Sequence, residues 1–150
     1  MKEAAERGLA VYEQLRGTER AQNMRALMDG RQFGASMLTL SMDFVFGNVW
    51  AREGLDRRAR SLVTLGILIA LRQREELKNH IRIALTNGLS PDEIEEVMIQ
   101  ASVYAGFPAA HAAGNAAAEV LEALELEREA PRDPGIDEVS RSRPVCMAPE

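Results

Sequence analysis

Apolar residues recur at intervals of three and four along most of this 150-residue chain, which predicts amphipathic helices. No segment shows the strict alternation of a β-strand, and no internal repeat is present. The pattern therefore predicts an all-α protein, with helices over residues 1–16, 20–29, 36–50, 57–71, 74–86, 91–105 and 109–127.

Several helix ends carry local signals. Ser90 stands three residues before Glu93 and is followed by Pro91, which predicts a capping box at a helix start. Asp56 is placed to cap the start of the 57–71 helix. Gly88 follows Asn87 at the end of the 74–86 segment, where a left-handed glycine would end the helix.

Two segments favour contact between subunits. From Leu62 to Leu71 the helix is apolar on every side, so we expect it at the centre of the fold or in a subunit interface. Residues 109–118 are rich in alanine, which permits close helix packing inside one subunit or between subunits. We expect a homo-oligomer.

Length and composition narrow the class of protein. Residues 1–128 fit one helical domain, and residues 129–150, which are rich in proline and charge, are expected to form a disordered tail. A net charge of −5 without a basic stripe argues against nucleic acid and an anionic membrane as partners. The N-terminus lacks the apolar run of a signal peptide and the longest apolar stretch is too short to span a bilayer, so we expect a cytoplasmic protein.

The residues that could carry chemistry begin with His80, at the edge of the apolar face of the 74–86 helix. An imidazole there could meet a ligand and move a proton, with Glu76 one turn away to orient it. The alternative is a structural histidine with a satisfied hydrogen bond, and for His111 we favour such a packing or capping role. Cys146 is the only cysteine, so neither an internal disulfide nor a zinc site is expected.

Arginines crowd the start of the helix after Asp56. Arg57, Arg58 and Arg60 oppose the helix dipole there, and Arg52 lies just upstream, which favours a bound anion such as a substrate carboxylate. Salt bridges to glutamates are the alternative. Asn48 and Trp50 could line a pocket for a flat, charged small molecule, although Trp50 could equally pack in the core. No metal-binding cluster, phosphate loop or serine-nucleophile motif is present.

Three ordered segments resemble the γ-carboxymuconolactone decarboxylases. Residues 50–62, WAREGLDRRARSL, resemble the family's WxRxGLDRRxRSL. Residues 80–88, HIRIALTNG, resemble HxRxALxNG, and residues 104–110, YAGFPAA, are similar to YCGxPAA. With the helix start at Ser90, the resemblance covers roughly residues 30–120.

The resemblance implies an AhpD-like helical bundle with an oligomeric core, assembled as a trimer or hexamer. It also implies a cofactor-free decarboxylase for a small carboxylated lactone such as 4-carboxymuconolactone, in aromatic catabolism. On this hypothesis His80 and Arg57 are catalytic: His80 manages the proton that replaces carbon dioxide, and Arg57 holds a carboxylate. Asn48, Trp50 and Arg52 bind the substrate, with no metal or cofactor.

The sequence departs from the family at informative positions. The cysteines of the CxxCxxxH peroxidase branch would fall at Gln73 and Glu76, and its acidic relay residue at about Ser61, so thiol peroxidase activity is not expected. Ala105 replaces the family's usual cysteine. Asn48 stands where the decarboxylases usually have glutamate. Two alternatives stay open: recruitment to other chemistry, such as isomerisation or cyclisation in secondary metabolism, and a non-catalytic oligomeric binding protein.

Overall fold

A computed structural model describes residues 2–129 of the chain. Every regular element in this part is a helix, which confirms the all-α prediction. The helices are α1 (Lys2–Arg16), α2 (Thr18–Asp29), α3 (Ala35–Leu40), η1 (Ser41–Trp50), α4 (Arg57–Ala70), α5 (Arg74–Thr86), α6 (Pro91–Ala105) and α7 (Phe107–Glu129).

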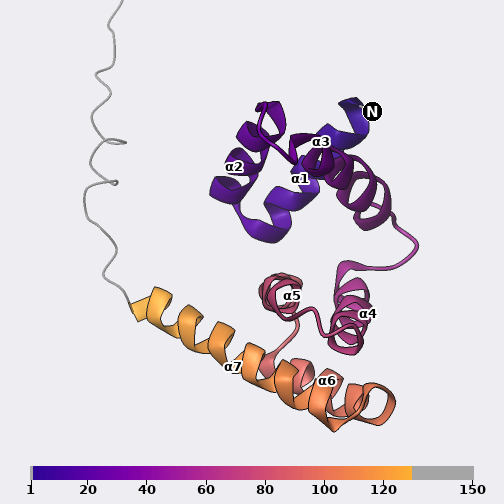
Figure 1. Cartoon of the computed structure of the whole chain (residues 1–150), viewed down its shortest axis with the longest axis vertical. Coiled ribbons are helices and arrows are strands. Elements are labelled where there is room, and N and C mark those ends of the chain that lie inside the picture. Colours follow the sequence, from indigo (N-terminus) through magenta and orange to yellow (C-terminus); the bar gives the residue numbers. More distant parts are fainter. Residues whose placement is uncertain (1, 130–150) are drawn as a thin grey trace, which may run out of the picture.

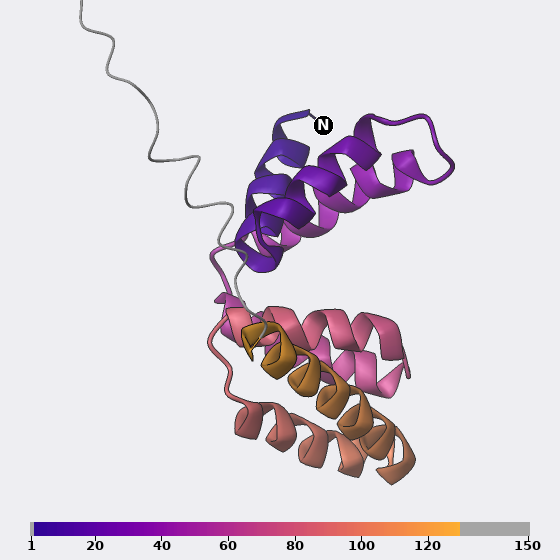
Figure 2. The ribbon, with the colours of Figure 1, turned by 90° about the vertical axis from the view of Figure 1, so that its left-hand side faces the viewer.

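The helices form two tiers. Figures 1 and 2 show α1, α2, α3 and η1 grouped together, with α4 to α7 below them and residues 51–56 as the link. Each tier buries its own apolar cluster, and α5 contributes to both. Its Ile81 and Ala84 lie in the lower cluster, whereas Ile83 lies in the upper cluster beside Leu15 and Trp50. The helix that carries His80 therefore packs against the N-terminal helices as well as against α4, α6 and α7.

The upper tier depends on a close contact between α1 and η1. A methyl group at Gly8 would overlap the carbonyl of Met42, and one at Gly47 would overlap the carbonyl of Ala4. α3 continues directly into η1, which is π-helical. At its end the N–H of Ala51 donates to the Phe46 carbonyl five residues back, at 3.1 Å. The sequence predicted a helix here but not its π-helical winding.

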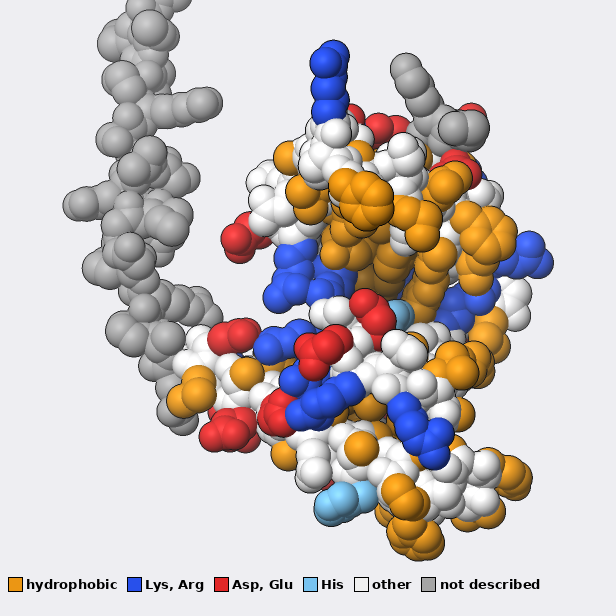
Figure 3. Space-filling view, viewed as in Figure 1, with side chains coloured by type: hydrophobic (Ala, Val, Ile, Leu, Met, Phe, Trp, Pro, Cys, Tyr) orange, Lys and Arg blue, Asp and Glu red, His pale blue; other side chains and the backbone are white. Residues whose placement is uncertain are grey.

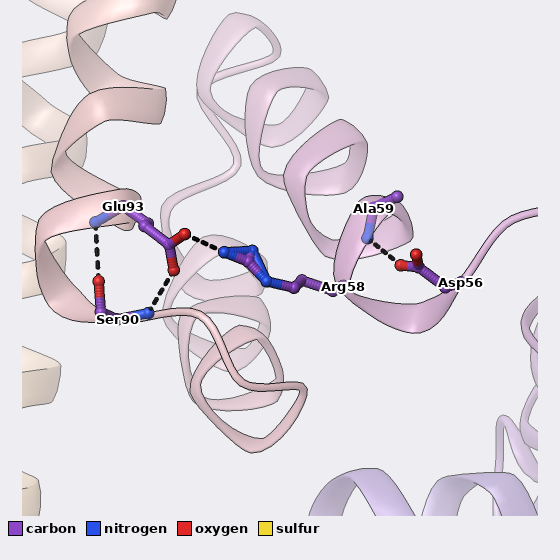
Figure 4. A network of polar contacts seen from close by, with 5 residues as sticks. All are labelled: Asp56, Arg58, Ala59, Ser90 and Glu93. Atoms are coloured by element: carbon purple, nitrogen blue, oxygen red, sulfur yellow. Dashed lines mark hydrogen bonds and ion pairs between the residues drawn. The ribbon is translucent and has the colours of Figure 1, made fainter.

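The predicted helix ends are confirmed. Figure 4 shows the Ser90 hydroxyl accepting from the Glu93 N–H at 3.2 Å, while the Glu93 carboxylate accepts from the Ser90 N–H at 2.9 Å. The Asp56 carboxylate accepts from the Ala59 N–H at 2.7 Å, so it caps α4. Gly88 has a φ of 88°, and the Leu89 N–H bonds back to the Ala84 carbonyl, as in a Schellman motif.

The expectation that α4 lies at the centre of the fold is wrong for the single chain. This helix is not buried at the centre of the fold, because Val63, Ile67 and Leu71 are 56 %, 53 % and 62 % exposed. α4 packs on α5 and α6 along one side only, and its other side meets solvent in a single chain. The alternative of a subunit interface stays a prediction.

Other boundaries differ by a turn or less. α2 begins at Thr18 rather than residue 20, and α7 begins at Phe107, so Pro108 lies in its first turn, where proline is tolerated. Four alanines of α7 pack inside the subunit, since Ala109, Ala113, Ala116 and Ala117 belong to the lower cluster, whereas Ala112 and Ala118 are exposed. None of the helices in residues 2–129 is both long and apolar enough to cross a membrane. The predicted tail from residue 130 onward lies outside the described residues.

Candidate active site

His80 lies on α5 at the seam between the two tiers. Its ring stacks on the indole of Trp50 from η1, with 5.9 Å between ring centroids and 29° between ring planes. Trp50 is buried in the upper cluster, whereas His80 is half-buried. The structure thus brings together two residues that stand 30 positions apart and that sequence analysis assigned to one site.

The Trp50 indole ends a row of aromatic side chains that starts on α1. Tyr12 meets Phe46 edge to face at 5.1 Å, and Phe46 stacks on Trp50 at 6.5 Å. Aromatic pairs in these geometries stabilise beyond their buried area. The indole face that His80 contacts is therefore fixed from behind by α1 and η1.

The electrostatics of His80 favour a neutral ring. Burial lowers the pKa of His80 below its ordinary value, and the Arg16 guanidinium lowers it further, while the Glu76 carboxylate acts in the opposite direction. The buried Nδ1 has no hydrogen-bond partner among the described residues. A neutral imidazole carries one N–H donor and one lone pair, so it can both donate and accept a proton.

The arginines at the start of α4 have different partners. Arg58 forms an ion pair with Glu93 of α6, as Figure 4 shows, so the salt-bridge alternative applies to this residue. Arg57 donates from Nη2 to the amide oxygen of Gln14 at 2.5 Å. Arg60 donates from Nη2 to the backbone carbonyl of Arg52 at 3.1 Å. Arg57 therefore meets a neutral acceptor, which an anionic ligand could replace without breaking an ion pair.

Asn48 and Arg52 are both exposed, whereas Trp50 is buried and His80 half-buried. The Asn48 amide donates to the Asp43 carbonyl at 2.7 Å and accepts from Arg7 Nη2 at 3.2 Å. Arg52 has an exposed side chain on the linker to α4. Within residues 2–129 no hydrogen bond joins His80 to Asn48, Arg52 or Arg57, so the five predicted residues do not form one connected network in the single chain.

The last turn of α1 supplies residues that sequence analysis missed. Arg16 donates to both the backbone carbonyl and the side-chain oxygen of Asn79, at 3.0 Å each. Gln14 of the same turn accepts the hydrogen bond from Arg57. Arg16 stands at a helix C-terminus, where a cation is explained by the helix dipole, so no sequence signal distinguished it.

Clefts also open elsewhere on the described part of the chain. One of about 460 Å³ lies beside the last turn of α1 and is lined by Gln14, Arg16, Arg20 and Arg82 among others. A groove of about 540 Å³ between α6 and α7 includes His111, and one of about 730 Å³ between α4 and α6 includes Leu62 and Tyr104. His80 lines none of the three.

Comparison with known proteins settles the family. The sequence profile described as "Carboxymuconolactone decarboxylase family" matches residues 35–119, more than half of the chain. The chain belongs to the carboxymuconolactone decarboxylase family. The matched segment contains all five predicted site residues, while Arg16 lies outside it. The resemblance inferred from three motifs is therefore confirmed.

Two named relatives of this family member are decarboxylases. It is 37% identical over 122 residues to 4-carboxymuconolactone decarboxylase of Acinetobacter baylyi, covering 81% of this chain and 90% of the relative. It is 39% identical over 101 residues to nitrosuccinic acid decarboxylase npaB of Metarhizium robertsii, covering 67% and 69% respectively. A third relative is an uncharacterised 15.0 kDa protein of Paracoccus denitrificans, 36% identical over 45% of this chain and 52% of that protein.

Proposed function

We propose that this protein is a cofactor-free decarboxylase of a small carboxylated substrate, with 4-carboxymuconolactone as the first candidate. One observation carries the proposal: the similarity to a 4-carboxymuconolactone decarboxylase extends over 90% of that relative. The stacked pair of His80 and Trp50 supports it, because a half-buried imidazole held in place by an aromatic ring suits proton transfer to a bound substrate.

The proposed chemistry assigns a role to four of the five predicted residues. Arg57 exchanges its Gln14 partner for the substrate carboxylate, with Arg52 as a second cation. Trp50, which is buried and stacked on both Phe46 and His80, lines the pocket from behind the imidazole. When the bond to the carboxylate carbon breaks, carbon dioxide leaves and its bonding electron pair stays on the lactone as an enolate. The lone pair of the neutral His80 ring takes up a proton from solvent, and the resulting imidazolium passes it to the enolate, where it takes the place of carbon dioxide. The ring is neutral again at the end of the reaction.

Replacing each histidine in turn tests this function. His80→Ala should lower decarboxylation of 4-carboxymuconolactone by about 10²–10⁴-fold, the usual contribution of a positioned proton-transfer group. His111→Ala is the matched control, since His111 is exposed on α7 and lies outside the proposed site. Turnover is followed by loss of the lactone and release of carbon dioxide, with circular dichroism to confirm that both variants fold.

Two results would contradict the proposal. Full activity of His80→Ala would remove His80 from the mechanism. A folded wild-type protein that decarboxylates neither 4-carboxymuconolactone nor related small acids would favour the non-catalytic alternative.

A different carboxylated substrate is the second candidate, and Asn48 is the observation that favours it. Asn48 replaces the family's usual glutamate, and because its side chain is an amide it offers no carboxylate to the site. The amide is hydrogen-bonded to Arg7 and to the Asp43 carbonyl. The relative named nitrosuccinic acid decarboxylase, 39% identical over 101 residues, is named for another substrate.

Restoring the glutamate distinguishes the two candidates. Asn48→Glu can keep the contact with Arg7 as an ion pair, and we expect it to raise decarboxylation of 4-carboxymuconolactone if Asn48 is what separates this chain from that activity. Nitrosuccinate is assayed in parallel. Efficient turnover of 4-carboxymuconolactone by the wild type would show that Asn48 is no obstacle and would remove the main support for the second candidate.

The assembly we propose is a homo-oligomer, either a trimer or a hexamer. Figure 3 shows apolar side chains gathered over α3 and η1, and the exposed side of α4 is apolar as well. Large side chains at these surfaces are well exposed in the single chain, namely Phe33, Met37, Leu40 and Phe44 around α3 and η1, and Val63, Ile67 and Leu71 around α4. Contiguous apolar surface of this kind is typical of protein interfaces.

A further inference from the structure

The contact between Arg16 and Asn79 joins the two tiers beside the candidate site. Both terminal nitrogens of the half-buried guanidinium donate, Nη1 to the Asn79 backbone carbonyl and Nη2 to its side-chain oxygen. Two parallel bonds from a rigid planar group fix an orientation as well as a distance. A surface lysine or a single hydrogen bond would not hold α1 on α5 in this way.

The residue that Arg16 holds is covalently next to His80. Asn79 therefore transmits the position of α1 directly to the segment of α5 that presents the imidazole. The same helix also reaches the other side of the stack, because Tyr12 lies one turn before Arg16 and packs on Phe46, which stacks on Trp50. The last two turns of α1 thus reach both partners of the His80–Trp50 pair through one intervening residue each, Asn79 for His80 and Phe46 for Trp50.

Arg16 is also one of the charged groups that shift the pKa of His80. These groups are Glu76 on α5 itself and Arg16 on α1, with opposite effects on the pKa of His80. Burial lowers the pKa of Arg16, and Tyr12, Arg20 and Glu76 are the ionisable groups that act on it. Orientation and charge are therefore two separable consequences of one side chain.

We propose that Arg16 is a positioning residue for the decarboxylation: by clamping Asn79 from α1, it holds the His80 imidazole against Trp50 in the orientation that proton transfer needs. This inference rests on the proposed function for its kinetic consequence, but not for its structural one. Arg16 does not contact the stacked rings in its own right; it acts through Asn79.

The structural consequence is tested by NMR of the full chain with ¹³C-labelled histidine. The chain has two histidines, and His111→Gln assigns their signals. In the wild type the His80 ring protons should show a ring-current shift from the Trp50 indole. Arg16→Met should reduce that shift and raise the pKa of His80, because a clamp and a positive charge are both lost. Arg16→Lys should restore the pKa of His80 but not the shift, because one ammonium replaces the charge without the two-point contact.

The kinetic consequence is tested on the same variants. A small misplacement of a catalytic group costs up to about 10²-fold in rate, so we expect kcat to fall toward that extent in both Arg16→Met and Arg16→Lys with KM little changed. The matched control is Arg20→Met, an exposed arginine that lines the same cleft without contacting Asn79. Asn79→Ala, which removes only the side-chain acceptor, provides a second variant if Arg16→Met does not fold.

The structural and the kinetic consequence are contradicted by different results. If Arg16→Met and Asn79→Ala both keep the wild-type ring-current shift and kcat, Arg16 is not a positioning residue. If Arg16→Lys restores kcat fully, charge rather than orientation is what matters, and the proposal is wrong. If the wild type has no decarboxylase activity but the ring-current shift still depends on Arg16, the proposed function fails while the clamp stands.

Discussion

At the scale of single residues, His80 shows how a tertiary neighbour sets chemistry. Its half-buried ring stacks on Trp50, and burial lowers its pKa. A histidine whose pKa is lowered by folding binds fewer protons in the native state than in the unfolded state. The free energy of unfolding must therefore fall as pH falls through the interval from about 6.5, the ordinary value, down to the native pKa.

This linkage gives a prediction that needs no substrate. The free energy of unfolding of the wild type, measured by urea denaturation from pH 8 to pH 5, should decline below about pH 6.5. His80→Gln, which cannot titrate, should flatten the part of this decline between pH 6.5 and the native pKa. His111→Gln is the control and should follow the wild-type curve. Identical slopes for wild type and His80→Gln would show that folding does not perturb this imidazole.

At the scale of the elements, the contact between α1 and η1 is the tightest constraint on the site. Gly8 and Gly47 let the two backbones touch, and the aromatic row from Tyr12 to Trp50 depends on that approach. A side chain at either position would push α1 away from η1. The stack against His80 is thus supported by two glycines outside it.

Adding one methyl group tests this packing. Gly47→Ala should destabilise the protein by about 1–3 kcal/mol, the usual cost of overpacking, because the new methyl would overlap the Ala4 carbonyl. Gly114→Ala is the matched control. A methyl there meets nothing within 4 Å, so replacing this helical glycine should instead stabilise by about 0.5–1 kcal/mol. Equal effects of the two substitutions in urea denaturation would contradict the close contact.

At the scale of the whole molecule, the described chain leaves much apolar surface uncovered. The side of α4 that carries Val63 and Ile67 faces away from both clusters, although the sequence of this helix is apolar all round. A helix apolar on every side is expected to be buried on every side. The proposed oligomer would bury the face that the single chain cannot.

One charged substitution on α4 tests this assembly. Ile67→Glu should convert the oligomer to smaller species, because Ile67 is 53 % exposed in the single chain and contributes little to its own core. Leu126→Glu, at an exposed apolar position on the last turns of α7, is the control and should leave the assembly intact. Mass is measured by light scattering and fold by circular dichroism. A wild-type monomer at micromolar concentration would reject the proposal.

The sequence alone determined the features that depend on neighbours in the chain. The capping box at Ser90, the cap at Asp56 and the glycine at 88 fixed helix ends, because each relies on bonds between residues a few positions apart. Three motifs were enough to identify the family, since they carry residue types in a specific order.

Only the tertiary structure decided which predicted site residues meet. Trp50 and His80 come together, whereas Asn48 turns to Arg7 and the Asp43 carbonyl. These partners are not close neighbours in the helix pattern, so the sequence carried no sign of which would meet. The same holds for Arg16 and Asn79, which are 63 residues apart. Only the tertiary structure showed which side of α4 is exposed to solvent in the single chain. The hydrophobic effect favours burial of an apolar face, but it does not specify which surface covers that face.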